Sequence, residues 1–345
     1  MIDLILHYKC PNCGGDMHFN ADTGSLSCTS CGNEENIESY PENLLSASFE
    51  ENEVKEYHCD NCGAVLITEA DTTATNCSFC GAGVVIANRL AGVLAPKKVI
   101  PFTISKEEAI VAFRKWCRKG LLTPKGFMSA DRIKSITGMY VPFWLYDLNS
   151  DVDVTASCTK VRTYTSGDYI YTETKYYEAY RKINLDYVKI PVDASEKMND
   201  QLMDKLEPFP YEQLKDFKTP YLAGFISEKY NYSDSELLPR AKDKVSDYID
   251  SFVHSTFAGY HSIHYRNKNI DTKAVRSDYV LLPVWMVSYD YENQEHIFAM
   301  NGQTGKVVGK PPISKGKVAL WFSGIAAGSF LTLKCVSFFM GGGFF

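Results

Sequence analysis

Eight of the eleven cysteines stand in four Cys-x2-Cys pairs near the start of the chain. The first set consists of Cys10, Cys13, Cys28 and Cys31, and the second of Cys59, Cys62, Cys77 and Cys80. In each set the two pairs are separated by a spacing close to that of two-knuckle metal sites. Because Zn²⁺ prefers thiolate sulfur and four sulfurs close its tetrahedral coordination, each set predicts one structural zinc ion without a catalytic role.

The two sets belong to a duplicated segment. Residues 8–32 and 57–81 superpose without a gap, with Tyr8 on Tyr57 and Asp22 on Asp71. A glycine follows the second cysteine of every pair, where a knuckle turn needs a permissive backbone. The residues between the pairs, DMHFNADTGSLS and VLITEADTTATN, each favour a short β-hairpin. We therefore expect zinc ribbons over residues 1–35 and 57–90, with an acidic linker over 36–56.

Two alternatives to zinc stay open at this point. Four cysteines also accept iron. A disulfide framework is the other alternative, but the start of the chain lacks the basic segment and cleavage site of a secretory signal, which favours reduced thiols.

The charge distribution disfavours nucleic acid as a partner. Residues 1–90 hold 3 basic and 14 acidic residues, a net of −11, and the remaining residues hold 33 basic and 28 acidic, a net of +5. A ribbon that binds nucleic acid needs lysine and arginine to neutralise phosphates. A basic surface would have to come from the middle of the chain, for example from Lys97, Lys98, Arg114, Lys115, Arg118 and Lys119.

Residues 97–312 have the composition of a globular α+β domain with an antiparallel sheet. Residues 105–120 predict a helix with a Ser105–Glu108 capping box, and residues 236–256 predict a second helix with Val245, Ile249, Phe252 and Val253 at core spacing. After each helix, residues 138–183 and 279–309 predict a strand followed by a hairpin. Pro142-Phe143-Trp144 and Pro283-Val284-Trp285 mark equivalent points, which indicates an internal duplication.

Other chemistry-bearing residues in this domain favour plain structural roles. His254, His261 and His264 have spacing that could reach a metal, but no carboxylate or cysteine accompanies them in sequence. Cys117 and Cys158 fall at predicted core positions. The string NGQTGK at residues 301–306 has the wrong glycine spacing for a phosphate-binding loop and predicts a hairpin turn. No catalytic motif is found, so a non-enzymatic protein is expected.

The C-terminal segment is apolar. Residues 318–345 contain a single charge, Lys334, and residues 318–340 are long enough for a transmembrane helix if Lys334 snorkels. Lys310, Lys315 and Lys317 precede it, so the positive-inside tendency predicts a cytoplasmic body on a single C-terminal anchor in the cytoplasmic membrane. A buried helix of a soluble core is the alternative, and the sequence leaves open whether the segment spans or only embeds.

The paired knuckles resemble the transcription factor IIB-type, or rubredoxin-like, zinc ribbon. Together with the C-terminal segment, nearly the whole chain resembles a family of zinc-ribbon membrane proteins from Gram-positive bacteria, whose members are often labelled PriA-like helicases. The resemblance implies a place in phage-shock-like membrane-stress systems, with SPFH (flotillin-like) and phage-shock protein A-like proteins as partners. In this sequence only the paired cysteine knuckles support the helicase label.

These observations lead to two expectations of function. The first is a membrane-anchored cytoplasmic adaptor that presents its zinc ribbons to protein partners, with two ribbons acting as a bivalent binder. The alternative is a nucleic-acid-associated factor of the helicase or transcription type.

Overall fold

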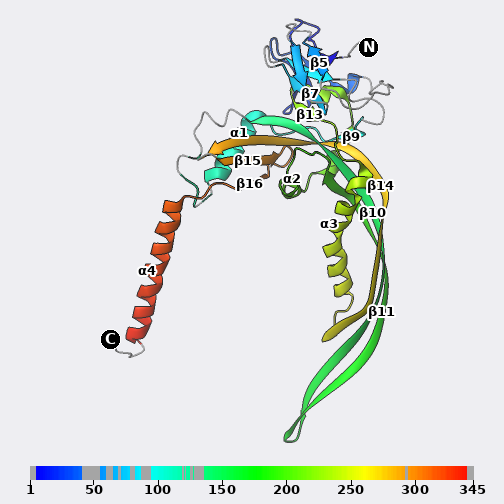
Figure 1. Ribbon diagram of the computed structural model, residues 1–345, viewed down its shortest axis with the longest axis vertical. Coiled ribbons are helices and arrows are strands. Elements are labelled where there is room, and N and C mark those ends of the chain that lie inside the picture. The colour runs from blue at the N-terminus through cyan, green and yellow to red at the C-terminus, as the bar shows by residue number, and fades with distance from the viewer. Residues whose placement is uncertain are drawn as a thin grey trace.

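The computed structural model describes residues 5–40, 55–59, 65–68, 71–77, 82–86, 95–118, 120, 122–124, 127, 136–291 and 294–339. Figure 1 shows an arch: the N-terminal strands lie at its crown, a long hairpin extends from one end, and an isolated C-terminal helix extends from the other. Cys62, Cys80 and most of the expected acidic linker lie outside the described residues.

Helices are few in the described part of the chain. The α-helices are α1 (Lys106–Arg118), α2 (Asp200–Leu206), α3 (Asp234–Ser255) and α4 (Lys315–Phe339). Short 3₁₀ turns span Ile37–Ser39, Tyr211–Gln213 and Thr219–Leu222.

Strands make up the rest of the fold. The N-terminal strands are β1 (Ile5–Leu6), β2 (Met17–Asn20), β3 (Ser25–Cys28), β4 (Glu34–Glu35), β5 (Lys55–His58), β6 (Val65–Thr68), β7 (Thr72–Asn76) and β8 (Gly83–Ile86). The body strands are β9 (Lys98–Val99), β10 (Thr137–Ser166), β11 (Tyr169–Asp193), β12 (Lys215–Asp216), β13 (Ile226–Glu228), β14 (Ser262–Tyr291), β15 (Gln294–Asn301) and β16 (Val307–Gly309).

The predicted hairpins of the body are confirmed. β10 and β11 pair antiparallel from Phe143↔Asp193 to Ser166↔Tyr169, around a two-residue turn in which Gly167 has φ +62°. β15 and β16 form the second hairpin, closed where the Asn301 N–H donates to the Lys306 carbonyl at 3.0 Å. NGQTGK is therefore a turn, as expected.

The sheet is mixed, which corrects the expectation of an antiparallel one. β10 and β14 pair antiparallel from Thr137↔Met286 to Thr159↔Ser262, but β9 joins β14 in parallel and β13 joins β10 in parallel. These two short pairings are long-range, and no local sequence pattern encodes them.

The order of elements supports the internal duplication. Each half runs from a short strand to a helix, a long strand and that strand's hairpin partner: β9–α1–β10–β11 and β13–α3–β14–β15. Both helices begin with a capping box, Ser105 with Glu108 and Ser233 with Glu236. Each half places its short strand beside the long strand of the other half.

Helix α3 packs on the β10–β11 hairpin through one face. Val245, Ile249 and Val253 recur every four residues and are buried, opposite the buried face of β10 that includes Val152, Val154, Ala156 and Cys158. Phe252 was expected in this core but is 47% exposed. With Ile249 and Val253 already facing the sheet, the 3.6-residue period turns Phe252 to the flank of the helix.

Helix α4 makes up the end of the described chain, and none of its side chains from residue 315 to residue 337 is buried. The Ser314 N–H donates to the Leu122 carbonyl at 2.8 Å and Lys317 Nζ donates to the Thr123 carbonyl at 2.7 Å, so only its first turn is tied to the body. Residues 315–337 are long and apolar enough to cross a membrane.

Candidate metal centre

Four cysteine sulfurs converge at the N-terminal end of the molecule. The Sγ atoms of Cys10, Cys13, Cys28 and Cys31 all lie within 4.8 Å of one another. The Cys10–Cys31 and Cys13–Cys28 sulfur distances are both 3.5 Å. A tetrahedron with metal–sulfur bonds of 2.3 Å places its sulfurs about 3.8 Å apart. The four thiols are free, so this first predicted set fits a metal ion and not a pair of disulfides.

Two matching turns hold these sulfurs. The Gly14 N–H donates to the Cys10 carbonyl, and the Gly32 N–H donates to the Cys28 carbonyl. Gly14 and Gly32 have φ values of +72° and +74°, a conformation that disfavours any side chain. The β2–β3 hairpin joins the two turns, as predicted, and β4 adds a third strand.

The ionisation of the thiols shows why a cation suits the site. The backbone N–H groups of Cys31 and Ser30 lower the pKa of Cys28 to about 6. The N–H of Asn33 lowers the pKa of Cys31, but the neighbouring thiols of Cys13 and Cys10 raise it more, to about 12. Four thiols this close do not all ionise without a compensating positive charge, which a bound divalent cation supplies.

Only part of the second predicted set lies within the described residues. Cys59 and Cys77 are buried. The Cys77 N–H donates to the carbonyl of Ala82, five residues on, just as the Cys28 N–H donates to the carbonyl of Asn33. The hairpin expected over residues 65–76 is not the pairing found among the described residues: β6 pairs with β5, and β7 pairs with β8.

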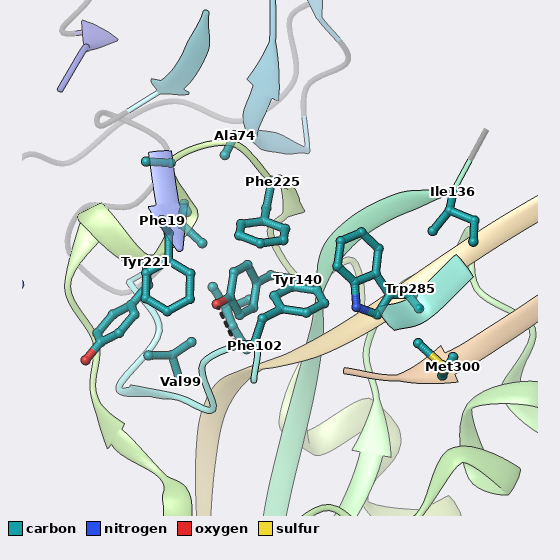
Figure 2. Close-up of a cluster of buried hydrophobic side chains, with 14 of the residues drawn as sticks. Phe19, Ala74, Val99, Phe102, Ile136, Tyr140, Tyr221, Phe225, Trp285 and Met300 are labelled. Atoms are coloured by element: carbon teal, nitrogen blue, oxygen red, sulfur yellow. Dashed lines mark hydrogen bonds between the residues drawn. The ribbon is translucent and has the colours of Figure 1, made fainter. Parts of the chain in front are cut away.

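The cysteine-rich strands are built into the body by an aromatic core. Phe19 of β2 packs against Tyr221 and Phe225, with ring centroids 5.5 and 6.2 Å apart. Phe225 stacks on Phe102 at 4.3 Å, and Figure 2 shows these rings continuing to Tyr140 and Trp285 of the long strands. Strand β7 also pairs with β13, which makes the second cysteine segment part of the large sheet.

Polar contacts reinforce this junction at points that sequence reasoning did not identify. Lys197 Nζ lies 3.0 Å from Asp71 and 3.2 Å from Glu228, and both carboxylates are nearly buried. Lys218 Nζ lies 2.9 Å from Glu38. Asp71 is the repeat equivalent of Asp22, which is exposed. The repeat showed that this aspartate recurs, but only the tertiary structure distinguishes the two copies.

The histidines do not form a metal site. In the described residues the Cys10–Cys31 set is the only group of metal-ligating side chains brought together. His254 Nδ1 lies 3.4 Å from the Tyr265 hydroxyl, and His261 Nδ1 accepts the Val161 N–H at 3.1 Å. These contacts join a helix end to the neighbouring strands.

Cys117 and Cys158 are core residues, as expected. Both are buried, and burial raises the pKa of Cys117 to about 12, so its thiol is a poor nucleophile. Two members of the candidate basic surface are neutralised, because Lys97 lies 2.7 Å from Asp278 and Lys98 lies 3.0 Å from Asp216. Lys119 lies outside the described residues.

Fold and site together define an α+β protein with a large mixed sheet, a four-cysteine cluster whose geometry could hold a metal ion, and an apolar C-terminal helix long enough to cross a membrane. The chain is 72% identical over 341 residues to the uncharacterized protein YdjG of Bacillus subtilis (strain 168), which covers 99% of this chain and 100% of that relative. It belongs to the family of that protein. No family model and no solved structure matches the chain.

Proposed function

We propose that the protein is a membrane-anchored, non-enzymatic zinc protein that acts as a cytoplasmic adaptor. In this proposal each cysteine set holds one structural zinc ion, α4 anchors the chain in the cytoplasmic membrane, and the acidic ribbon surface binds protein partners. The resemblance to zinc-ribbon membrane proteins suggests a membrane-stress system, with SPFH-type and phage-shock protein A-like proteins as the first partners to test.

The observation that carries the proposal is helix α4. Apolar side chains occur around its whole circumference, and residues 318–336 are all exposed. A helix of this kind is unstable in water, because it exposes a large continuous apolar surface with no polar face. The hydrocarbon core of a membrane accommodates this apolar surface, and the length of α4, 25 residues, suits a bilayer.

The structure changes how the two ribbons would act. They were expected to work as two linked modules, but the aromatic core and the Lys197 and Lys218 ion pairs hold both cysteine segments against the body. We therefore propose that they form one composite surface with fixed geometry. We do not favour the nucleic-acid alternative, because Lys97 and Lys98, two of the six residues named for a basic surface, are already ion-paired.

The first experiment tests the anchor. The full chain and a version ending at Ser314 are expressed, and membranes are washed at alkaline pH. We expect the full chain to stay in the pellet and the shortened chain to become soluble. If both are soluble, the anchor and with it the adaptor proposal are wrong, and salt-dependent binding to DNA is the next measurement.

The second experiment tests metal and partner together. Replacing Cys10 and Cys13 by alanine is expected to remove one equivalent of zinc and to reduce partner capture in mild detergent, with membrane attachment unchanged. Cys335→Ala is the matched control, because Cys335 is exposed on α4, far along the chain from the cluster. Capture that survives loss of the metal would contradict a role for the ribbons.

A further inference from the structure

The lower part of the long hairpin is exposed on every side. β14 accompanies β10 only as far as Thr159↔Ser262. Beyond that point, in the described chain, β10 and β11 pair only with each other, and every side chain from Arg162 to Glu178 is exposed. This tip is rich in tyrosine; Tyr169, Ile170 and Tyr176 are 70–81% exposed. A two-stranded ribbon of this kind is marginally stable in water by itself.

The outer edge of β11 is protected in one part and open in another. Near the body, a register shift, Lys189 with φ +56° and Pro191 interrupt regular pairing. From Tyr169 to Asp186 there is no proline, glycine or register shift. Proteins protect exposed edge strands with such features or with charged side chains. Here the charges have both signs, so this long regular edge is suited to accepting a strand of complementary charge.

The hairpin turn determines which backbone groups face outward. In a two-residue hairpin the closing pair, here Ser166 and Tyr169, exchanges both backbone hydrogen bonds, and bonded pairs then alternate along the ladder. The odd-numbered residues of β11 near the tip therefore bond to β10. The N–H and C=O groups of Ile170, Thr172, Thr174, Tyr176 and Glu178 point away from it.

We propose that this edge pairs antiparallel with the same edge of a second copy, with Thr174 on the two-fold axis. In this register the outward-facing residues meet as bonded pairs: Thr174 with itself and Thr172 with Tyr176 of the other copy. The intervening non-bonded pairs, whose side chains lie closer, place Glu173 opposite Lys175 and Tyr171 opposite Tyr177. The two-fold axis generates each of these favourable pairs twice.

The charges at the tip favour a second copy of the protein over a lipid surface as the binding partner of this edge. The tip carries three basic residues (Lys160, Arg162 and Lys175) and three acidic residues (Asp168, Glu173 and Glu178). Adsorption to an anionic leaflet depends on a basic excess, which is absent. A balanced, self-complementary edge favours the same edge of another copy. The inference goes beyond the adaptor function and does not depend on bound metal.

A charge exchange in the full-length protein, in detergent micelles, tests the pairing. Lys175→Glu would place Glu173 opposite a glutamate twice, and we expect dimerisation, measured by sedimentation, to weaken about fivefold or more. Within its own hairpin Lys175 faces Lys160 and also lies 3.4 Å from Glu173, both exposed, so the change relieves one repulsion and removes one weak attraction inside the chain. Glu173→Lys should weaken dimerisation likewise, and the double variant should restore it.

Other results would overturn the proposal. Unchanged dimerisation in Lys175→Glu excludes this register. A double variant as weak as the single ones would mean that Glu173 does not face Lys175 of the other copy. Glu173→Lys that increases binding to anionic vesicles, with no effect on dimerisation, indicates a lipid surface.

Disulfide trapping tests the position of the axis independently. In a Cys335→Ser background, Thr174→Cys should give a cross-linked dimer on mild oxidation, because residues facing each other across a bonded pair are about 5.5 Å apart at Cα. Thr163→Cys is the matched control: Thr163 is also exposed at the tip but lies on β10, one strand away from the axis. Equal cross-linking at the two positions would contradict the pairing.

Discussion

At the scale of single residues, Asp193 is the least expected feature of the structure. It ends β11 with its side chain fully buried, 3.1 Å from Arg240 Nη1, and its second oxygen, Oδ2, has no hydrogen-bond partner among the described residues. Burial raises the pKa of Asp193 to about 7, against the opposing effect of Arg240. Arg240 also pairs with Asp200 and Asp204 of α2, so this residue cluster fastens α2, α3 and β11 together.

The raised pKa gives a prediction about pH. Between its ordinary value of 3.8 and about 7, Asp193 keeps a proton in the folded state that the unfolded chain releases. Its contribution to stability is therefore present below about pH 4 and is lost as the pH rises through about 7, by up to about 4 kcal/mol. Asp193→Asn should flatten the pH dependence of the free energy of unfolding between pH 5 and 8. An unchanged slope in urea titrations would show that Asp193 is ionised throughout.

At the scale of elements, the loop between the 3₁₀ turn Thr219–Leu222 and β13 positions the first cysteine hairpin. The Phe19 N–H donates to the Ala223 carbonyl at 2.9 Å. Gly224 has φ +89°, and a Cβ there would lie 2.6 Å from His18 Nδ1. The hairpin thus approaches the backbone of the body as closely as a glycine allows.

Two glycine substitutions distinguish the effect of the close contact at Gly224 from the effect of backbone strain. Gly224→Ala and Gly259→Ala both force a residue with a side chain into positive φ, at about 1–2 kcal/mol each. A Cβ at Gly259 meets nothing within 4 Å, so only Gly224→Ala should also loosen the cysteine hairpin. We expect faster hydrogen exchange of the Phe19 amide in Gly224→Ala and not in Gly259→Ala. Equal exchange in both variants would mean that the hairpin is held by other contacts.

At the scale of the whole molecule, the direction of α4 limits how the protein sits on a membrane. Figure 1 shows α4 and the β10–β11 hairpin leaving the body on the same side, with the hairpin extending further. The hairpin carries exposed charges such as Arg162, Glu173 and Lys175, which hydrocarbon does not accommodate. If α4 crosses a bilayer, it must turn about residues 310–314, which include Pro311 and Pro312.

Thiol labelling in sealed membrane vesicles checks this arrangement. Ile170→Cys, at the hairpin tip, should react with a membrane-impermeant maleimide from the cytoplasmic face. Phe330→Cys, within α4, should react only after detergent is added. Protection of position 170 before detergent would show that the hairpin enters the membrane or is covered there.

Much of the local structure was predictable, because it depends on residues close in sequence. The knuckle turns follow from cysteine and glycine spacing, the start of α1 from the Ser105–Glu108 capping box, and the β10–β11 hairpin from alternation around Ser166-Gly167-Asp168. The prediction that Phe252 lies in the core was wrong, because the four-residue spacing of Ile249 and Val253 leaves position 252 on the flank of the helix. Only contact with the sheet shows which side of the helix is buried.

The sequence by itself thus determined the first cysteine cluster, the long hairpin, the capped helices and the apolar C-terminal helix, since each is encoded by short-range spacing and hydrophobicity. Only the tertiary structure decided that β9 and β13 pair across the two halves, that Asp71 is clamped by Lys197 while Asp22 stays exposed, and that the cysteine segments join the core of the body. These features depend on which distant surfaces fit together in shape and charge, and that complementarity exists only in the folded chain.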